Sequence, residues 1–294
     1  MTAPRDCVVV GAGGPLGFEI ARLLAERGAR VRATYRTPKA GLADALEQIN
    51  AEAVQFDISD AEAAHPVFSN VDTVIATPIL TVSRQLTRHL KASARSIFLS
   101  SNNVAIDPDA PVYRDLIAAE TAVAHTAPNA IILRPTMIYG HAQDGNLSGL
   151  MQAMRRFPVV PMIGSGEAMQ QPVFYRDLAA AAVALASDEA WRPGVRAVAG
   201  PAPLSTRRLY NEVRAAARAR CVFAPLPGAL VGVGLKALNA VGIATPISAA
   251  QIRRAGLDKT PVGETITAAT PLGDGLAVLS DALDGALDAE GRPA

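Results

Sequence analysis

The chain alternates short apolar runs with segments whose apolar residues recur at helical spacing. The apolar runs, rich in β-branched residues, predict buried strands at residues 7–10, 31–35, 53–57, 73–76, 96–99 and 130–133. Segments of helical periodicity lie between them, at 15–27, 42–50, 82–92 and 115–125. This alternation is typical of an α/β fold, with helices covering both faces of a parallel sheet.

The pattern weakens after Tyr139, where glycines and prolines interrupt the chain. Beyond this loop-rich stretch, the spacing predicts a helix at 177–187, a strand at 196–199 and a helix at 206–218. We therefore expect a first domain over residues 1–140. Residues 141–294 form mainly a substrate lobe and leave room for one or two strands to return to the sheet.

The first predicted strand opens directly into glycines. A helix that begins at such a turn presents free N–H groups, which bind the pyrophosphate of a dinucleotide. The residues expected at this phosphate site are Gly11, Gly13, Gly14, Pro15, Leu16 and Gly17. The fold we predict is α/β, a Rossmann-type doubly wound parallel sheet with a smaller C-terminal substrate lobe.

Charge and composition limit the classes of partner and the cellular setting that we expect for this chain. The net charge is +1 and charged residues are spread along the chain, so nothing indicates nucleic-acid binding. Cys7 and Cys221 lie far apart and resemble small buried residues, which fits a reducing cytoplasm. The apolar stretch 229–244 is shorter than the roughly 20 residues of a membrane span and contains Lys236 and Asn239, so we expect no integral membrane segment.

The residues that follow the second predicted strand indicate whether NAD or NADP is preferred. An acid there indicates NAD, whereas a cation indicates the 2′-phosphate of NADP. This chain has no acid at that place but has Arg36 and Lys39, which favours NADP(H) over NAD(H). Asp57 and Ile58 follow the third strand, where a carboxylate can accept a hydrogen bond from adenine; Asp57 could equally cap the strand end.

Several segments together resemble the atypical and extended short-chain dehydrogenases/reductases, the NAD(P)-dependent epimerase/dehydratase family. The resemblance rests on VGAGGPLG at the start, FLSS at 98–101, ILRPTMIYG at 132–140, and QPV at 171–173 leading to DLA at 177–179. It implies that Ala76, Thr77 and Pro78 border the cofactor and that Pro135 lies beside the nicotinamide.

The catalytic set of that family is a Ser or Thr with Tyr-x-x-x-Lys. Ser101 matches the serine, with Ser100 beside it at the cofactor, and Tyr113 is the tyrosine that could begin the motif. Ile117 stands where the lysine belongs, and no lysine occurs between Lys91 and Lys236. Without this lysine, the motif lacks the cation that activates the tyrosine as a proton donor, so the sequence does not support the usual redox mechanism of the family.

Residues after position 138 supply candidate substrate contacts. The resemblance places Asp144, Asn146, Gly164 and Gln171 in loops that face the substrate. Tyr139 and Tyr175 are candidates to contact the substrate and supply a proton, with packing as the alternative role. The histidines show no paired metal-ligand spacing, so we expect no metal; His141 alone lies near the expected cleft.

Three functions remain open. The first is an NADP-dependent oxidoreductase that transfers hydride to or from a carbonyl or hydroxyl of a small substrate, with a homodimer left open. The second is a nucleotide-sugar epimerase, dehydratase or reductase. The third is a non-catalytic NADP(H)-binding sensor or assembly subunit, for which the missing lysine is the best support.

Overall fold

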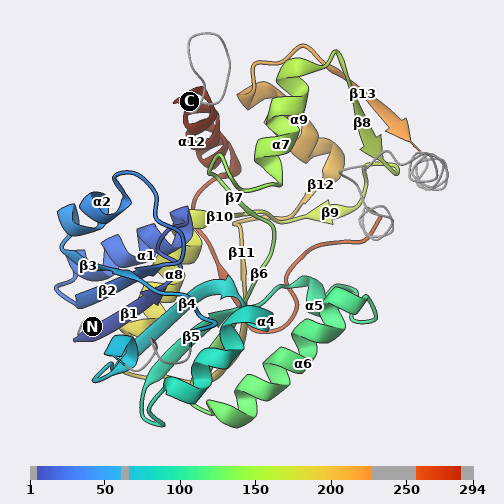
Figure 1. The fold of residues 1–294 in the computed structure, drawn as a ribbon. Helices are drawn as coiled ribbons and strands as arrows, with labels where there is room; N and C mark the ends of the chain where they lie inside the picture. Colours follow the sequence, from blue (N-terminus) through green and yellow to red (C-terminus); the bar gives the residue numbers. More distant parts are fainter. Residues whose placement is uncertain (1–4, 61–65, 227–255, 286–294) are drawn as a thin grey trace, which may run out of the picture.

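The computed structural model describes residues 5–60, 66–226 and 256–285, and its centre is an eight-stranded parallel sheet (Figure 1). The strand order is β14-β11-β6-β5-β4-β1-β2-β3, with every neighbouring pair parallel. The strands are β1 (Asp6–Val10), β2 (Arg30–Tyr35), β3 (Ala51–Gln55), β4 (Thr73–Ile79), β5 (Arg95–Leu99), β6 (Ala130–Pro135), β11 (Gly194–Ala199) and β14 (Thr265–Thr267). The predicted Rossmann-type doubly wound sheet is confirmed, and β11 and β14 return to it from the second half of the chain.

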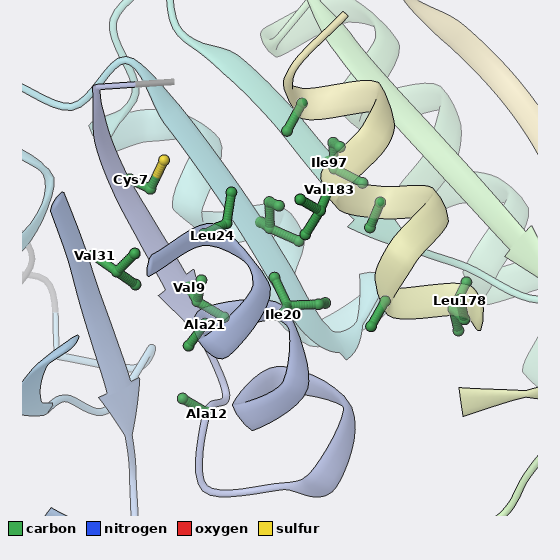
Figure 2. Packing of buried hydrophobic residues seen from close by; sticks show 14 of the residues in the cluster. Cys7, Val9, Ala12, Ile20, Ala21, Leu24, Val31, Ile97, Leu178 and Val183 are labelled. Carbon is green, nitrogen blue, oxygen red and sulfur yellow. The ribbon is translucent and has the colours of Figure 1, made fainter. Parts of the chain in front are cut away.

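Both faces of the sheet are buried because alternate residues of each strand point to opposite sides. Cys7 and Val9 of β1 pack into one core with α1 (Pro15–Glu26) and α8 (Tyr175–Ala186), as Figure 2 shows. Val8 and Val10 join the opposite core, which α6 (Pro111–Thr126) covers. This double burial explains why the strands are continuously apolar in the sequence.

One predicted helix is tighter and shorter than expected. Instead of an α-helix over 82–92, the chain forms a single α-turn, α4 (Leu80–Ser83), followed by the 3₁₀-helix η1 (Arg84–His89). The Thr87 hydroxyl donates to the Arg84 carbonyl at 2.9 Å. Such local side-chain bonds compete with the α-helical pattern, and apolar spacing alone does not reveal them.

The second half builds a lobe with its own core, in which α7, α9, β8 and β13 lie together (Figure 1). Its sheets are two-stranded pairs, β7 with β10, β9 with β12 and β8 with β13. The elements are β7 (Ile138–Tyr139), α7 (Leu147–Arg156), β8 (Val159–Ile163), β9 (Met169–Gln170), β10 (Val173–Phe174), β12 (Leu204–Ser205), α9 (Thr206–Ala216), β13 (Val222–Leu226) and α12 (Leu272–Gly285). Two short helices complete the chain order, α2 (Leu42–Gln48) and α5 (Asn103–Ile106).

The apolar stretch 229–244 lies outside the described residues. Among the helices that are described, none has the length and apolar character that a membrane crossing requires.

The turn after β1 depends on two glycines for different reasons. Gly11 has φ of 90°, a left-handed conformation that favours glycine. A Cβ on Gly17 would lie 2.3 Å from the Gly11 carbonyl oxygen, so only glycine lets α1 approach the turn this closely. Gly14, by contrast, has φ of −105° and 3.7 Å of room beside the same oxygen, and as the N-cap it offers α1 no side-chain cap. The free N–H groups at this helix start thus have no competing side chain from their own cap residue.

We expect Gly17→Ala to lower the free energy of unfolding by about 1–3 kcal/mol, because the added methyl group meets backbone atoms that cannot rotate away. Gly14→Ala is the matched control and should cost less than about 1 kcal/mol. Urea unfolding of both variants measures the difference. Equal stability of the two variants would contradict this account of the turn.

Candidate functional site

A cavity of about 470 Å³ lies over the glycine turn and the carboxyl ends of β1, β2 and β3. We call it the turn cavity. It brings together eight predicted cofactor residues: Gly11, Gly13, Gly14, Arg36, Lys39, Asp57, Ile58 and Pro78. The phosphate turn and the side chains expected to recognise the adenosine half therefore share one hollow.

Hydrogen bonds within the protein hold two charged side chains of the turn cavity, Lys39 and Asp57, in defined positions. The Lys39 ammonium donates to the Gly13 carbonyl at 2.8 Å, which brings its charge to the phosphate turn. Asp57 Oδ1 accepts from the Ser59 hydroxyl at 2.7 Å and from the Ser59 amide at 2.9 Å. These two bonds, and to a smaller degree the charge of Arg36, lower the pKa of Asp57, so its carboxylate is ionised and ready to accept hydrogen bonds.

A second cavity, of about 590 Å³, continues from the first along the ends of β5 and β6. We call it the strand-end cavity; Ile79 lines both. Six predicted residues lie in its wall: Leu16, Ser100, Ser101, Pro135, Asp144 and Asn146. Both cavities lie at the carboxyl edge on either side of β1, which is where ligands bind in open α/β sheets.

The two serines of the strand-end cavity have different tasks. The Ser100 hydroxyl donates to Glu120, whose carboxylate also receives the Arg134 guanidinium, with Nε to Oε1 at 3.0 Å. This buried cluster links the ends of β5 and β6 to α6. The Ser100 hydroxyl hydrogen is therefore used within the protein. Ser101 Oγ accepts from the Asn103 amide at 3.3 Å and is half-buried in the cavity wall. Ser101 is therefore the better placed of the two to donate to a ligand.

Tyr113 lies beneath the cavity and is not in its wall. Tyr113 is 8% exposed, and from α6 it packs into the core between this helix and the sheet. Its hydroxyl accepts from Asn103 Nδ2 at 3.0 Å. Asn103, not Tyr113, lines the cavity. Among the residues that the structure describes, no tyrosine lines the strand-end cavity.

The remaining predicted residues serve the scaffold. Pro15 begins α1, Gly17 packs on the turn, and Ala76 is fully buried. The Thr77 hydroxyl donates to the Val10 carbonyl at 3.0 Å, and Gln171 Nε2 donates to the Gly200 carbonyl at 2.7 Å.

Two tyrosines expected to face the substrate are also engaged within the protein. The Tyr139 hydroxyl donates weakly to the Leu272 carbonyl at 3.4 Å, and burial raises the pKa of this phenol. The Tyr175 hydroxyl accepts from Arg176 Nε at 3.1 Å.

Asp144 and Asn146 line the cavity and also order it. Asp144 Oδ1 accepts from the amides of Asn146 and Ser148 at 2.8 and 2.9 Å, and Oδ2 accepts from the Gly140 amide at 3.2 Å. This carboxylate therefore fixes the start of α7.

Sequence reasoning missed several polar residues of the strand-end cavity, among them Asn102 and Lys259. Asn102 is 2% exposed; its Nδ2 donates to the Thr260 carbonyl at 2.8 Å, and its Oδ1 accepts from the Val262 amide at 3.1 Å. These bonds hold residues 260–262 against the end of β5 and place Lys259 in the wall. No local signal near position 259 could have identified this, because the contact joins residues almost 160 positions apart.

His141, which the sequence places near the expected cleft, lines the strand-end cavity and is half-buried. Its ring lies edge-on to Tyr175 at 5.4 Å between centroids, and its buried Nδ1 has no partner among the described residues. Burial lowers the pKa of His141, against the opposing charge of Asp144, so the neutral imidazole is favoured. The part of the chain that the structure describes contains no group of residues that could hold a metal ion.

Comparison with known proteins agrees with this geometry. The NmrA-like family matches residues 5–92. A mitochondrial protein of Arabidopsis thaliana, NADH dehydrogenase [ubiquinone] 1 alpha subcomplex subunit 9, is 30% identical over 125 residues. That match spans 41% of this chain and only 31% of the relative.

Solved structures share the fold over nearly the whole chain. MoeE5 in complex with UDP-glucose and NAD has a TM-score of 0.68 at 18% identity, covering 95% of this chain and 99% of that one. UDP-glucose 4-epimerase of Thermotoga maritima has a TM-score of 0.68 at 16% identity, with the same coverage. The family match and the shared fold together confirm the resemblance to the atypical and extended short-chain dehydrogenases/reductases.

The His141 pKa has a consequence for stability. Because the folded protein favours neutral His141, the unfolded state binds more protons just below the ordinary histidine pKa of about 6.5, and stability is lost as the pH falls through that range. We expect His141→Asn to reduce this loss, measured by urea unfolding between pH 7.5 and 5. His125→Asn, on the exposed end of α6, is the control. A constant offset between the wild-type and His141→Asn curves would contradict the assignment.

Proposed function

We propose that this chain binds a nicotinamide dinucleotide along the carboxyl edge of its sheet and transfers hydride between it and a carbonyl or hydroxyl of a small substrate. The observation that carries the proposal is the meeting of the turn cavity and the strand-end cavity at Ile79. Together they offer an elongated ligand a phosphate turn in one part and Ser101 with Pro135 in the other. MoeE5, whose solved structure contains NAD, shares the fold of this chain and supports the same proposal.

We further propose that NADP(H) is preferred to NAD(H). The turn cavity has Arg36 and Lys39 beyond the end of β2, where a 2′-phosphate would lie, and β2 ends without an acid. A guanidinium can contact phosphate through two parallel hydrogen bonds, and Lys39 adds a second charge beside Gly13. Asp57 is suited to the adenine amino group.

Arg36→Ala should weaken NADPH binding at least about tenfold, or about 1.4 kcal/mol, and leave NADH binding nearly unchanged, because only NADPH carries the 2′-phosphate. Fluorescence titration of the purified protein with both nucleotides measures this. Arg30→Ala removes an exposed arginine at the opposite end of β2 and is the matched control. An equal loss for both nucleotides, or none, would argue against NADP(H) preference.

The chemistry falls to residues of the strand-end cavity. The nicotinamide, when bound, supplies or accepts hydride. Ser101 can donate its hydroxyl hydrogen to the substrate oxygen. Neutral His141 can accept the alcohol proton during oxidation and become imidazolium, and in the reverse direction the imidazolium returns that proton to the substrate oxygen during reduction. The Tyr113 hydroxyl accepts a hydrogen bond from Asn103 Nδ2 and so holds Asn103 in the wall of the same cavity.

Ser101→Ala should lower NADPH-dependent carbonyl reduction roughly 10²-fold, because a hydrogen-bond donor to the reacting oxygen is lost. NADPH affinity should not change. Ser101→Thr keeps the hydroxyl and should retain most of the rate. Stopped-flow measurement of NADPH oxidation against a panel of aldehydes and ketones tests this, and turnover that survives Ser101→Ala would remove Ser101 from the mechanism.

A second function is supported by a specific pair of observations. No described tyrosine lines the strand-end cavity, and the curated relative is by its name a subunit of an NADH dehydrogenase. On this alternative the chain holds NADP(H) as a structural or sensing ligand within an assembly. NADPH binding without hydride exchange on any carbonyl, together with co-purification of a stoichiometric partner, would favour it over the oxidoreductase.

A further inference from the structure

A third cavity, of about 540 Å³, lies within the C-terminal lobe and is not used by the dinucleotide proposed above. We call it the lobe cavity. Met137, Asn146 and Lys259 line both it and the strand-end cavity, so the two adjoin. Most of its wall is apolar and comes from α7, β8 and α9, with Leu147, Leu150, Ala153, Val160, Pro161, Ile163 and Leu209.

One residue of this wall, Gln170, has a buried polar atom that lacks a partner among the described residues. Gln170 is 3% exposed, and its Nε2 donates to the Thr206 hydroxyl oxygen at 3.2 Å. The Thr206 hydroxyl donates its one hydrogen to the Ala168 carbonyl at 2.8 Å, so its oxygen can only accept from Gln170. This fixes the orientation of the amide and leaves Gln170 Oε1 as a buried acceptor with no donor among the described residues. A buried acceptor without a donor is costly, and in a cavity wall a ligand donor relieves that cost.

The charge of the wall restricts the ligand further. Lys259 is the one charged side chain among the described residues that line the lobe cavity, and it stands at the junction with the strand-end cavity. Its backbone amide donates to the Met169 carbonyl at 2.7 Å, which fixes its place. Diphosphate groups are usually bound by several cationic or N–H donors. The lobe cavity instead suits an uncharged apolar group.

We infer that the lobe cavity takes the apolar body of the substrate. The substrate class is an alcohol or carbonyl compound whose reacting carbon lies beside Ser101, and whose apolar body carries one hydroxyl or N–H that donates to Gln170 Oε1. This inference rests on the proposed oxidoreductase function for the reacting end alone. The apolar body and its donor are assigned from the lobe cavity itself.

The test uses 2-naphthol and naphthalene as probes, which differ by one hydroxyl donor, with binding measured by calorimetry on the full chain. Wild type should bind 2-naphthol about tenfold more tightly than naphthalene. Gln170→Met keeps the side-chain length but removes the acceptor, so the two probes should then bind equally. Ala153→Phe fills the cavity from α7 and should weaken both probes at least tenfold.

Gln152→Phe is the matched control, since residue 152 is exposed on the same helix and does not line the cavity. It should bind both probes like wild type, and thermal unfolding shows that each variant is folded. Absence of probe binding to wild type, equal affinity for the two probes, or unchanged affinity in Ala153→Phe would each overturn the inference.

NADPH titration of the same proteins separates this inference from the proposed function. Equal affinity of the wild type for the two probes, with intact NADPH binding, would overturn the inference and leave the proposed function standing. Probe binding as expected without any NADPH binding would sink the proposed function and leave the lobe cavity as an apolar ligand site.

Discussion

The contact between Gly17 and the Gly11 carbonyl is the constraint on which the rest of the site depends. It lets α1 begin at Pro15, directly after the short turn that follows Val10 of β1, so that the start of this helix faces the open edge of the sheet. The sheet order reverses at the same place, with β2 on one side of β1 and β4 on the other. The crevice left by that reversal is where the turn cavity and the strand-end cavity meet.

Much of this could be predicted from sequence because the signals are local. Continuous apolar runs such as residues 7–10 follow from burial on both faces, and the glycine spacing follows from the geometry of one turn. Residues that reach the strand-end cavity through long-range contacts gave no such signal. Asn102 and Lys259 meet there only because a segment from the end of the chain crosses the end of β5.

Tyr113 illustrates a limit of prediction from a sequence motif: the motif does not determine which way a helix residue faces. The motif resemblance places this residue at the catalytic position, but neighbouring positions on a helix differ in direction by about 100°. Val112 is 57% exposed whereas Tyr113 is 8% exposed, so packing turns the aromatic ring into the core. Which of two adjacent helix residues turns into the core is decided by tertiary packing, and a spacing rule does not contain that information.

The walls of the lobe cavity come largely from α7, β8 and α9, none of which belongs to the eight-stranded sheet or to the glycine turn. A change of side chain on α7 therefore alters the space offered to a ligand without touching a residue of the turn cavity. Ligand preference and nucleotide binding can consequently diverge at separate rates during evolution. Within a lineage that keeps the turn intact, changes in this lobe can alter which ligand is accepted.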